Sequence, residues 1–230
     1  MTNKPKPGDS AQSGDQGEAR EFASPPCYQH EIAPGYQGPS RDDWAGVREW
    51  RKAQRTRLSR LRESIEPAER NRLTESIMDN LRRAFVLQSE VVAFYWPLPG
   101  EIDLRPLVTE LASKGARLAL PAIVGKDEPL EFRRWKPGDE LDESGLWNIP
   151  TPTVRDIVTP TLIYVPLLGF DKDCHRLGHG GGFYDRTLAV PGVAPVTVGI
   201  AYESGRLATI YPQEHDIAIN AIATERDVTF

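Results

Sequence analysis

The sequence predicts an α/β protein, a Rossmann-like three-layer sandwich around a mostly parallel sheet. Short apolar runs typical of buried strands alternate with amphipathic helical stretches, at the spacing expected of strand–helix–strand units. The length of 230 residues, with 39% hydrophobic and 27% charged residues, fits one ordinary globular domain with a tail. In such sheets, ligands bind at the loops beyond the carboxyl ends of the strands.

Three helices are predicted from their caps and apolar spacing. The first follows the capping pair Asp42-Asp43 and runs to about residue 64. The second opens at Pro67, a favoured first-turn residue, and continues through Leu81. The third occupies residues 104–114 and ends at Gly115. The predicted strands are 90–96, 117–123, 130–135, 161–165, 195–201 and 221–224.

Residues 1–41 are rich in Pro, Gly, Ser and Gln and contain few aliphatic side chains. Such a segment buries too little apolar surface to offset its ordering entropy, so we predict a mostly disordered, passive tail before a folded domain at 42–230.

Composition excludes several classes of protein. A net charge of −5 argues against nucleic-acid binding, and no apolar run approaches the ~20 residues of a membrane span. Cys27 and Cys174 are too few for a disulfide framework. No signal or transit peptide is recognisable, so we expect a cytoplasmic protein without a nucleic-acid or membrane partner.

Residues 176–186 read Arg-Leu-Gly-His-Gly-Gly-Gly-Phe-Tyr-Asp-Arg and are the most informative stretch. Glycines allow consecutive backbone N–H groups to turn toward one anion, and a helix starting near Phe183 would add further donors. The stretch lacks the Gly-Lys-Ser/Thr ending of a Walker A loop and does not match a dinucleotide fingerprint. We favour a phosphate-binding loop over a merely tight glycine turn.

Two other constellations accompany this loop. Arg51, Lys52 and Arg55 gather on one helix, where arginines four residues apart suit phosphate oxygens, although a solvated basic face is the preferred interpretation from these residues alone. In the loop at 96–103, Glu101 is placed to hold a substrate N–H, and Trp96 is the aromatic residue best placed to reach a ligand. Asp103 is better explained as a helix N-cap.

Asp185 and Asp216 are candidate magnesium ligands, because Mg²⁺ takes one or two carboxylates and completes its shell with water and phosphate oxygens. From the residues alone Asp216 would be interpreted as a surface-turn residue and would not be selected. His175 and His179 have the spacing of a zinc pair, but the surrounding glycines make a helix improbable. We interpret His179 as a loop side chain over the ligand.

The order of four motifs resembles the 5-formyltetrahydrofolate cyclo-ligase family. They are the basic pair in Arg51-Lys-Ala-Gln-Arg55, the loop Pro97-Leu-Pro-Gly-Glu-Ile-Asp103, Trp147-Asn-Ile-Pro150, and the glycine stretch with its approach from Val165. The resemblance covers about residues 48–226. It implies an ATP- and Mg²⁺-dependent closure of 5-formyltetrahydrofolate, with or without a polyglutamate chain, to 5,10-methenyltetrahydrofolate.

The resemblance also implies roles for individual residues. Glu101, Arg176 and Tyr184 are the candidate catalytic residues, and Asp185 and Asp216 the magnesium ligands. The ATP-binding candidates are Arg51, Lys52, Arg55, Arg176, Leu177, Gly178, His179, Gly180, Gly181, Gly182, Phe183 and Tyr184. The folate-binding candidates are Trp96, Glu101, Trp147, His179, Gly180, Gly181, Gly182 and Phe183.

Phosphorylating the formyl oxygen would turn a poor leaving group into phosphate, which departs after the ring-closing nitrogen attacks carbon. We expect a monomeric enzyme. The alternatives are a non-catalytic folate- or nucleotide-binding paralogue, and an ATP-dependent enzyme of the same fold with another substrate.

Overall fold

The structure is a computed structural model that describes residues 39–40, 42–85, 91–144, 148–192 and 194–230. The tail predicted at 1–41 lies almost wholly outside the described residues, as does Trp147 of the predicted site.

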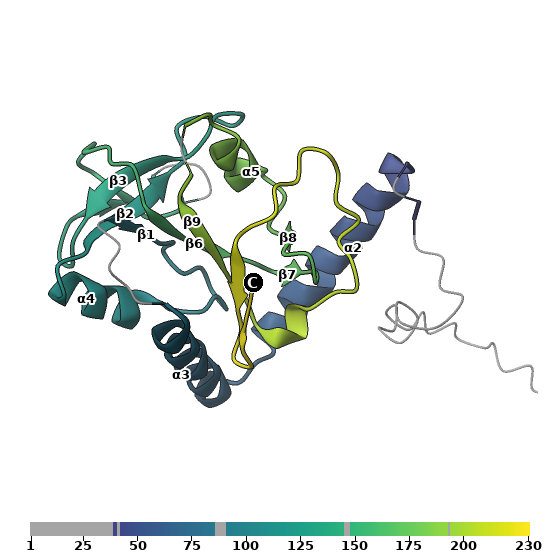
Figure 1. Ribbon diagram of the computed structural model, residues 1–230, viewed down its shortest axis with the longest axis horizontal. Helices are drawn as coiled ribbons and strands as arrows, with labels where there is room; N and C mark the ends of the chain where they lie inside the picture. Colours follow the sequence, from purple (N-terminus) through teal and green to yellow (C-terminus); the bar gives the residue numbers. More distant parts are fainter. Residues whose placement is uncertain (1–38, 41, 86–90, 145–147, 193) are drawn as a thin grey trace, which may run out of the picture. The chain divides into compact units, whose positions relative to one another are not determined.

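Within the described residues, seven strands form one sheet in the order β11-β10-β9-β6-β1-β2-β3 (Figure 1). The five strands from β10 to β2 run parallel, and the edge strands β11 and β3 are antiparallel to their neighbours. The mostly parallel sheet predicted from sequence is thereby confirmed. The strands are β1 (Val91–Ala93), β2 (Arg117–Ala122), β3 (Glu131–Trp135), β6 (Leu162–Pro166), β9 (Val196–Ile200), β10 (Ala221–Ala223) and β11 (Val228–Thr229).

Helices cover both faces of the sheet because alternate strand residues point to opposite sides. Val92 and Tyr164 pack with Ile77 of α3 (Pro67–Ala84) and Leu111 of α4 (Arg105–Ser113). Ile163 packs on the other face, in the cluster that includes Leu188 of α5 (Phe183–Leu188). Figure 1 shows α3 and α4 together on one side of the sheet and α5 on the other, which gives the predicted three layers.

The longest helix among the described residues, α2 (Trp44–Glu63), begins after Asp43, whose carboxylate accepts the Gly46 N–H. The remaining elements are short. They are the strand pairs β4 (Leu141–Asp142) with β5 (Thr151–Pro152) and β7 (Gly169–Phe170) with β8 (Arg176–Leu177), and the 3₁₀ turn η2 (Glu203–Gly205). No helix among the described residues is long and apolar enough to cross a membrane.

Two local predictions were wrong. The strand predicted at 90–96 ends at Ala93, and the following aromatic residues continue outside the ladder although Phe94 and Tyr95 are buried. Asp103 is not the N-cap of α4, which is Leu104. The Asp103 carboxylate instead accepts the Arg105 N–H and pairs with the Arg105 guanidinium.

The sheet topology determines where a ligand can bind. β1 lies between β2 and β6, so the chain leaves β1 toward one side and later returns beside it on the other. Ligand sites of open α/β sheets lie at the carboxyl ends of the strands where the order reverses in this way. The segments that follow β1 and β6 meet at this point, where Glu101 of the first contacts His179 of the second.

Candidate active site

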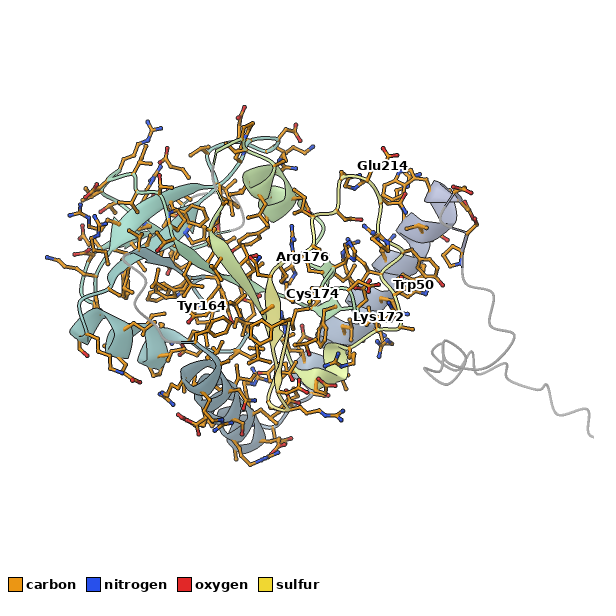
Figure 2. The ribbon with its side chains drawn as sticks, in the orientation of Figure 1. Trp50, Tyr164, Lys172, Cys174, Arg176 and Glu214 are labelled. Atoms are coloured by element: carbon orange, nitrogen blue, oxygen red, sulfur yellow. The ribbon has the colours of Figure 1, made fainter. Side chains whose placement is uncertain are left out.

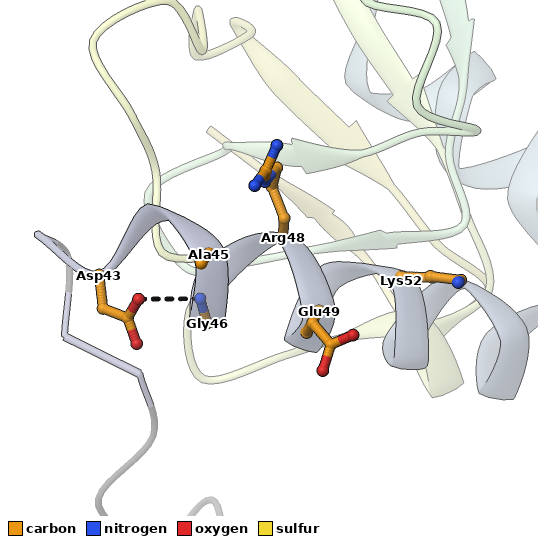
Figure 3. Close-up of a pocket in the computed structure, with 6 residues that line it drawn as sticks. All are labelled: Asp43, Ala45, Gly46, Arg48, Glu49 and Lys52. Carbon is orange, nitrogen blue, oxygen red and sulfur yellow. Dashed lines mark hydrogen bonds between the residues drawn. The ribbon is translucent and has the colours of Figure 1, made fainter.

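A cleft of about 1210 Å³ opens at this point of the sheet. Its wall combines the first half of α2, the loop after β1, the loop at 178–182 after β8, here called the glycine loop, and the segment at 214–217. Arg176 and Glu214, which both line it, are labelled in Figure 2. A second, shallower hollow lies at the start of α2 and contains Asp43, Arg48, Glu49 and Lys52 (Figure 3). We assign the candidate site to the larger cleft, because it gathers the predicted residues.

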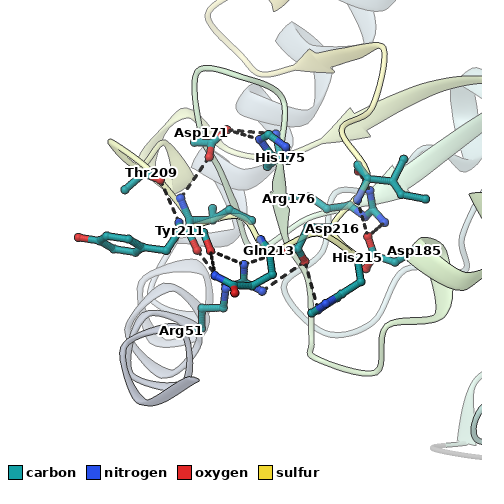
Figure 4. A network of polar contacts seen from close by, with 12 residues as sticks. Arg51, Asp171, His175, Arg176, Asp185, Thr209, Tyr211, Gln213, His215 and Asp216 are labelled. Atoms are coloured by element: carbon teal, nitrogen blue, oxygen red, sulfur yellow. Dashed lines mark hydrogen bonds and ion pairs between the residues drawn. The ribbon is translucent and has the colours of Figure 1, made fainter. Parts of the chain in front are cut away.

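At one end of the cleft, Arg51 joins α2 to the segment at 210–216. Its Nε donates to Ile210 O at 3.0 Å and one terminal nitrogen donates to Tyr211 O at 2.9 Å. The same guanidinium pairs with the Asp216 carboxylate at 2.5 Å (Figure 4). Arg51 is only 6% exposed. The preferred interpretation of Arg51 as part of a solvated face was therefore wrong. Asp216 does close a turn, since its N–H donates to Gln213 O, but its side chain is only 10% exposed.

Arg55 lies one turn further along α2 and joins the helix to the glycine loop. Its Nε donates to Gly178 O at 2.8 Å. Burial, followed by the neighbouring charge of Arg51, lowers the pKa of Arg55, while Asp216 opposes the shift. Two close cations at one end of a cleft favour a polyanionic ligand. Lys52 and Arg48 line the same end.

The glycine loop adopts backbone angles that other residues rarely allow. Gly180 has φ +97° and Gly182 has φ +68° immediately before α5. A Cβ at Gly180 would lie 3.3 Å from the Arg55 guanidinium carbon, so an added side chain here would press on Arg55. Arg186 holds the loop from the far side by donating to Gly181 O and Lys126 O.

Arg176 and Asp185 form a second ion pair at 2.5 Å, visible beside the first in Figure 4. Arg176 also donates to Ile217 O, and Asp185 Oδ1 also accepts the Ile217 N–H. Burial lowers the pKa of Arg176, against the opposing influence of Asp185 and Asp216. The glycine loop and the segment at 214–217 are thus joined by one polar network.

The two carboxylates fit a magnesium site of the kind that binds with phosphates. Asp185 and Asp216 both line the cleft, and both act electrostatically on Arg176. Among the described residues no group of three or more His, Cys, Asp or Glu side chains could hold a metal alone. Mg²⁺ on phosphoryl substrates requires only one or two carboxylates, and the ligand supplies the rest.

Glu101 occupies the other end of the cleft and is 4% exposed in its side chain. The turn that carries it has Pro99 and Gly100, with φ +83°, as its central residues, and the Glu101 N–H donates to Leu98 O. This matches the sequence requirement of a type II turn. Glu101 Oε2 in turn accepts the Leu98 N–H at 2.9 Å, and Oε1 lies 3.2 Å from His179 Nε2.

Aromatic side chains complete this end. The Trp96 ring packs edge-on against Trp135 with 5.9 Å between centroids, and the Arg105 guanidinium lies 4.9 Å from the Trp96 ring centre. Burial, followed by the charge of Glu101, raises the pKa values of Tyr95 and Tyr184. Both hydroxyls are therefore neutral at pH 7.

Most of the predicted site residues line this one cleft. The exceptions are Leu177, whose side chain is 1% exposed in the core, and Trp147, which lies outside the described residues. Sequence reasoning missed Trp44, Ile149, His215 and Ile217 as lining residues. Arg48 had a usable signal, since it lies three and seven residues before Arg51 and Arg55. Glu214, His215 and Ile217 had none, because only folding brings the segment at 214–217 to α2, and Asp216 in that segment was indicated by the family resemblance alone.

The fold and the cleft define a Rossmann-like α/β protein with a glycine loop and a cation cluster suited to an anionic ligand. The chain belongs to the 5-formyltetrahydrofolate cyclo-ligase family, whose profile matches residues 47–225. It is similar to the 5-formyltetrahydrofolate cyclo-ligases of Mycolicibacterium smegmatis, at 30% identity, and Escherichia coli K12, at 32%. The alignments cover 75% of this chain and 92% of the first relative, and 62% and 82% for the second.

Solved structures agree with this assignment. The 5,10-methenyltetrahydrofolate synthetase of Aquifex aeolicus superposes with a TM-score of 0.67 at 31% identity, covering 78% of this chain and 91% of the other. The synthetase from Mycoplasma pneumoniae, at 20% identity, shares the fold with a TM-score of 0.63 over 76% and 98% of the two chains. The resemblance drawn from the four motifs is confirmed.

Proposed function

We propose that this chain converts 5-formyltetrahydrofolate to 5,10-methenyltetrahydrofolate, with ATP and Mg²⁺, releasing ADP and phosphate. One observation carries the proposal. A single cleft has a cationic end beside a glycine loop, an aromatic end with a buried carboxylate, and His179 of that same loop in contact with Glu101. A nucleotide and a folate would therefore meet across the glycine loop.

The cationic end would bind the triphosphate. Arg51, Lys52 and Arg55 supply positive charge, and the amides of the glycine loop supply donors. Asp185 and Asp216 would hold Mg²⁺, which neutralises phosphate charge when bound. Arg176, already fixed by Asp185 and Ile217, would compensate the charge that develops during transfer.

At the other end, Glu101 would orient the pterin by accepting its N–H groups, and Trp96 and Phe183 would offer apolar surface. The γ-phosphoryl group of ATP passes to the formyl oxygen, and ADP leaves. The ring-closing nitrogen then attacks the formyl carbon, the carbon–oxygen bond breaks with departure of phosphate, and the nitrogen loses its proton. We assign acceptance of that proton to Glu101. The neutral Tyr184 hydroxyl is a hydrogen-bond donor toward the reacting oxygen.

The test is an absorbance assay of the purified chain with 5-formyltetrahydrofolate, following the near-ultraviolet band of the methenyl product. We expect a rise that requires both ATP and Mg²⁺. No rise despite demonstrated folate binding would favour the non-catalytic paralogue. No rise and no folate binding would indicate another substrate on the same fold.

A further inference from the structure

One face of α2 reaches both ends of the cleft. Arg51, Arg55, Leu58 and Arg62 follow at intervals of four, three and four residues, which places them on a single helical stripe. Leu58 fixes this stripe against the β7–β8 hairpin, since a Cβ at Gly169 would lie 2.7 Å from Leu58 Cδ1. At about 1.5 Å per residue, Arg62 lies roughly 16 Å along the axis from Arg51.

Arg62, the last residue of this stripe, lies beside Glu101, the carboxylate proposed to bind the folate. One of its terminal nitrogens lies 3.5 Å from Glu101 Oε1, with only 10% of the Arg62 side chain and 4% of the Glu101 side chain exposed. Its Nε is buried and has no hydrogen-bond partner among the described residues. Because a buried charge is costly unless it is paired, the Arg62 guanidinium compensates the charge of the Glu101 carboxylate inside the fold.

The surrounding structure holds Arg62 in place. Arg70 donates to Arg62 O and Ile65 O, which fixes the chain at the end of α2. The Gly100 turn covers the guanidinium, because a Cβ at this residue would lie 3.4 Å from Arg62 Nε. Glu101 is thus held by the Leu98 N–H at one oxygen and flanked by Arg62 and His179 at the other.

We propose that Arg62 is a positioning residue for the folate site, acting through the Glu101 carboxylate that it holds in place. This inference rests on the proposed function for the identity of the ligand, but not for the Arg62–Glu101 pair itself. It gives α2 two roles, with Arg51 and Arg55 acting on the phosphates and Arg62 on the acceptor of the pterin N–H groups.

The first test is a double-mutant cycle of Arg62→Gln and Glu101→Gln, measured as the folate dissociation constant and as KM for each substrate. Arg62→Gln should weaken folate binding by about tenfold or more, the size expected for an interaction with a charged group, and leave KM for ATP within about twofold. Arg62→Lys should recover part of the loss. In the Glu101→Gln background, Arg62→Gln should add little. Equal losses for both substrates, or effects that multiply, would overturn the proposal.

Thermal unfolding of the same four proteins without ligands separates this inference from the proposed function. Each single substitution leaves one buried charge unpaired and should lower Tm, whereas the double variant should lose less than the sum. Arg60→Gln, an exposed site on the same helix with the same charge change, is the control and should leave Tm nearly unchanged. Additive losses in Tm would refute the pairing even if the wild-type protein failed to turn over folate.

Discussion

Asp185 accepts hydrogen bonds from Arg176 and from the Ile217 N–H, and both fall on Oδ1. Its side chain keeps 23% of its surface exposed, in the wall of the cleft. A carboxylate oriented through one oxygen can still offer the other to a cation. The ion pair with Arg176 is therefore compatible with a metal role for Asp185, because it orients the carboxylate before a metal ion binds.

Replacing Asp185 by Asn tests this role, because the amide oxygen can still accept from Arg176 and Ile217 while the negative charge is lost. We expect turnover to fall by about 100-fold or more, the usual effect of removing a group that compensates transition-state charge, with folate binding retained. Steady-state kinetics over a range of Mg²⁺ concentrations and direct folate titration would measure both. Asp173→Asn, at an exposed turn position, is the matched control. Unchanged turnover in Asp185→Asn would remove Asp185 from the metal site.

At the scale of elements, the glycine loop and α2 form one surface. Gly180 leaves little room for a Cβ beside the Arg55 guanidinium, and its backbone also adopts a positive φ. These two features can be separated, because Gly138 has the same φ of +97° in a turn that does not line the cleft, where an added Cβ meets nothing within 4 Å.

Gly180→Ala and Gly138→Ala should therefore cost similar stability, about 1–2 kcal/mol for a left-handed alanine. Only Gly180→Ala should raise KM for ATP, since its methyl group would press on the Arg55 guanidinium. Chemical unfolding measures the first effect, and initial rates at saturating folate measure the second. Equal KM values for the two variants would show that the approach of loop and helix does not matter for nucleotide binding.

The elements that the sequence predicted are those with a local signature. α2 has the capping Asp43, α3 opens at Pro67, and both helices have helical apolar spacing. β6 and β9 have buried apolar runs, so the ranges of these four elements agree with the prediction within a few residues. β4, β5, β7 and β8 are two residues long, too short for any periodicity. These strands pair as β4 with β5 and β7 with β8, where the intervening loops bring their ends together.

The site residues likewise divide into those with a local sequence signature and those without one. Glu101 and the glycine loop stand out by local composition, and the structure places them in one cleft. The partners of Arg51 lie about 160 residues further along the chain, so no local pattern could show that this arginine is buried. The resemblance to a family pointed to Asp216, which composition and spacing alone would not have selected.

For the whole molecule, the net charge does not indicate the charge of the site. The chain carries a formal charge of −5, yet the cleft gathers five arginines and a lysine, together with a few carboxylates. These are Arg48, Arg51, Lys52, Arg55, Arg176 and Arg186. Buried pairs such as Arg51–Asp216 keep the cluster compatible with folding and make stability depend on pH.

Acid should reveal the Arg51–Asp216 pair. Burial alone would raise the pKa of Asp216, but hydrogen bonds from Arg51 and the Gln213 N–H outweigh it and lower the pKa. A depressed pKa adds stability above the unfolded value of about 4, which is lost as the pH falls through the folded value. The Tm gap between wild type and Arg51→Gln should therefore be wide from pH 7 to 5 and narrow toward pH 3.

The gap should not close completely, because Arg51 also donates to Ile210 O and Tyr211 O at any pH. Arg60→Gln, with the same change of charge on an exposed part of α2, should give a small gap that varies little with pH. A gap for Arg51→Gln that stays constant or widens down to pH 3 would mean that Asp216 is not held ionised by Arg51. The carboxylate would then have to be treated as available to Mg²⁺ without competition from the helix.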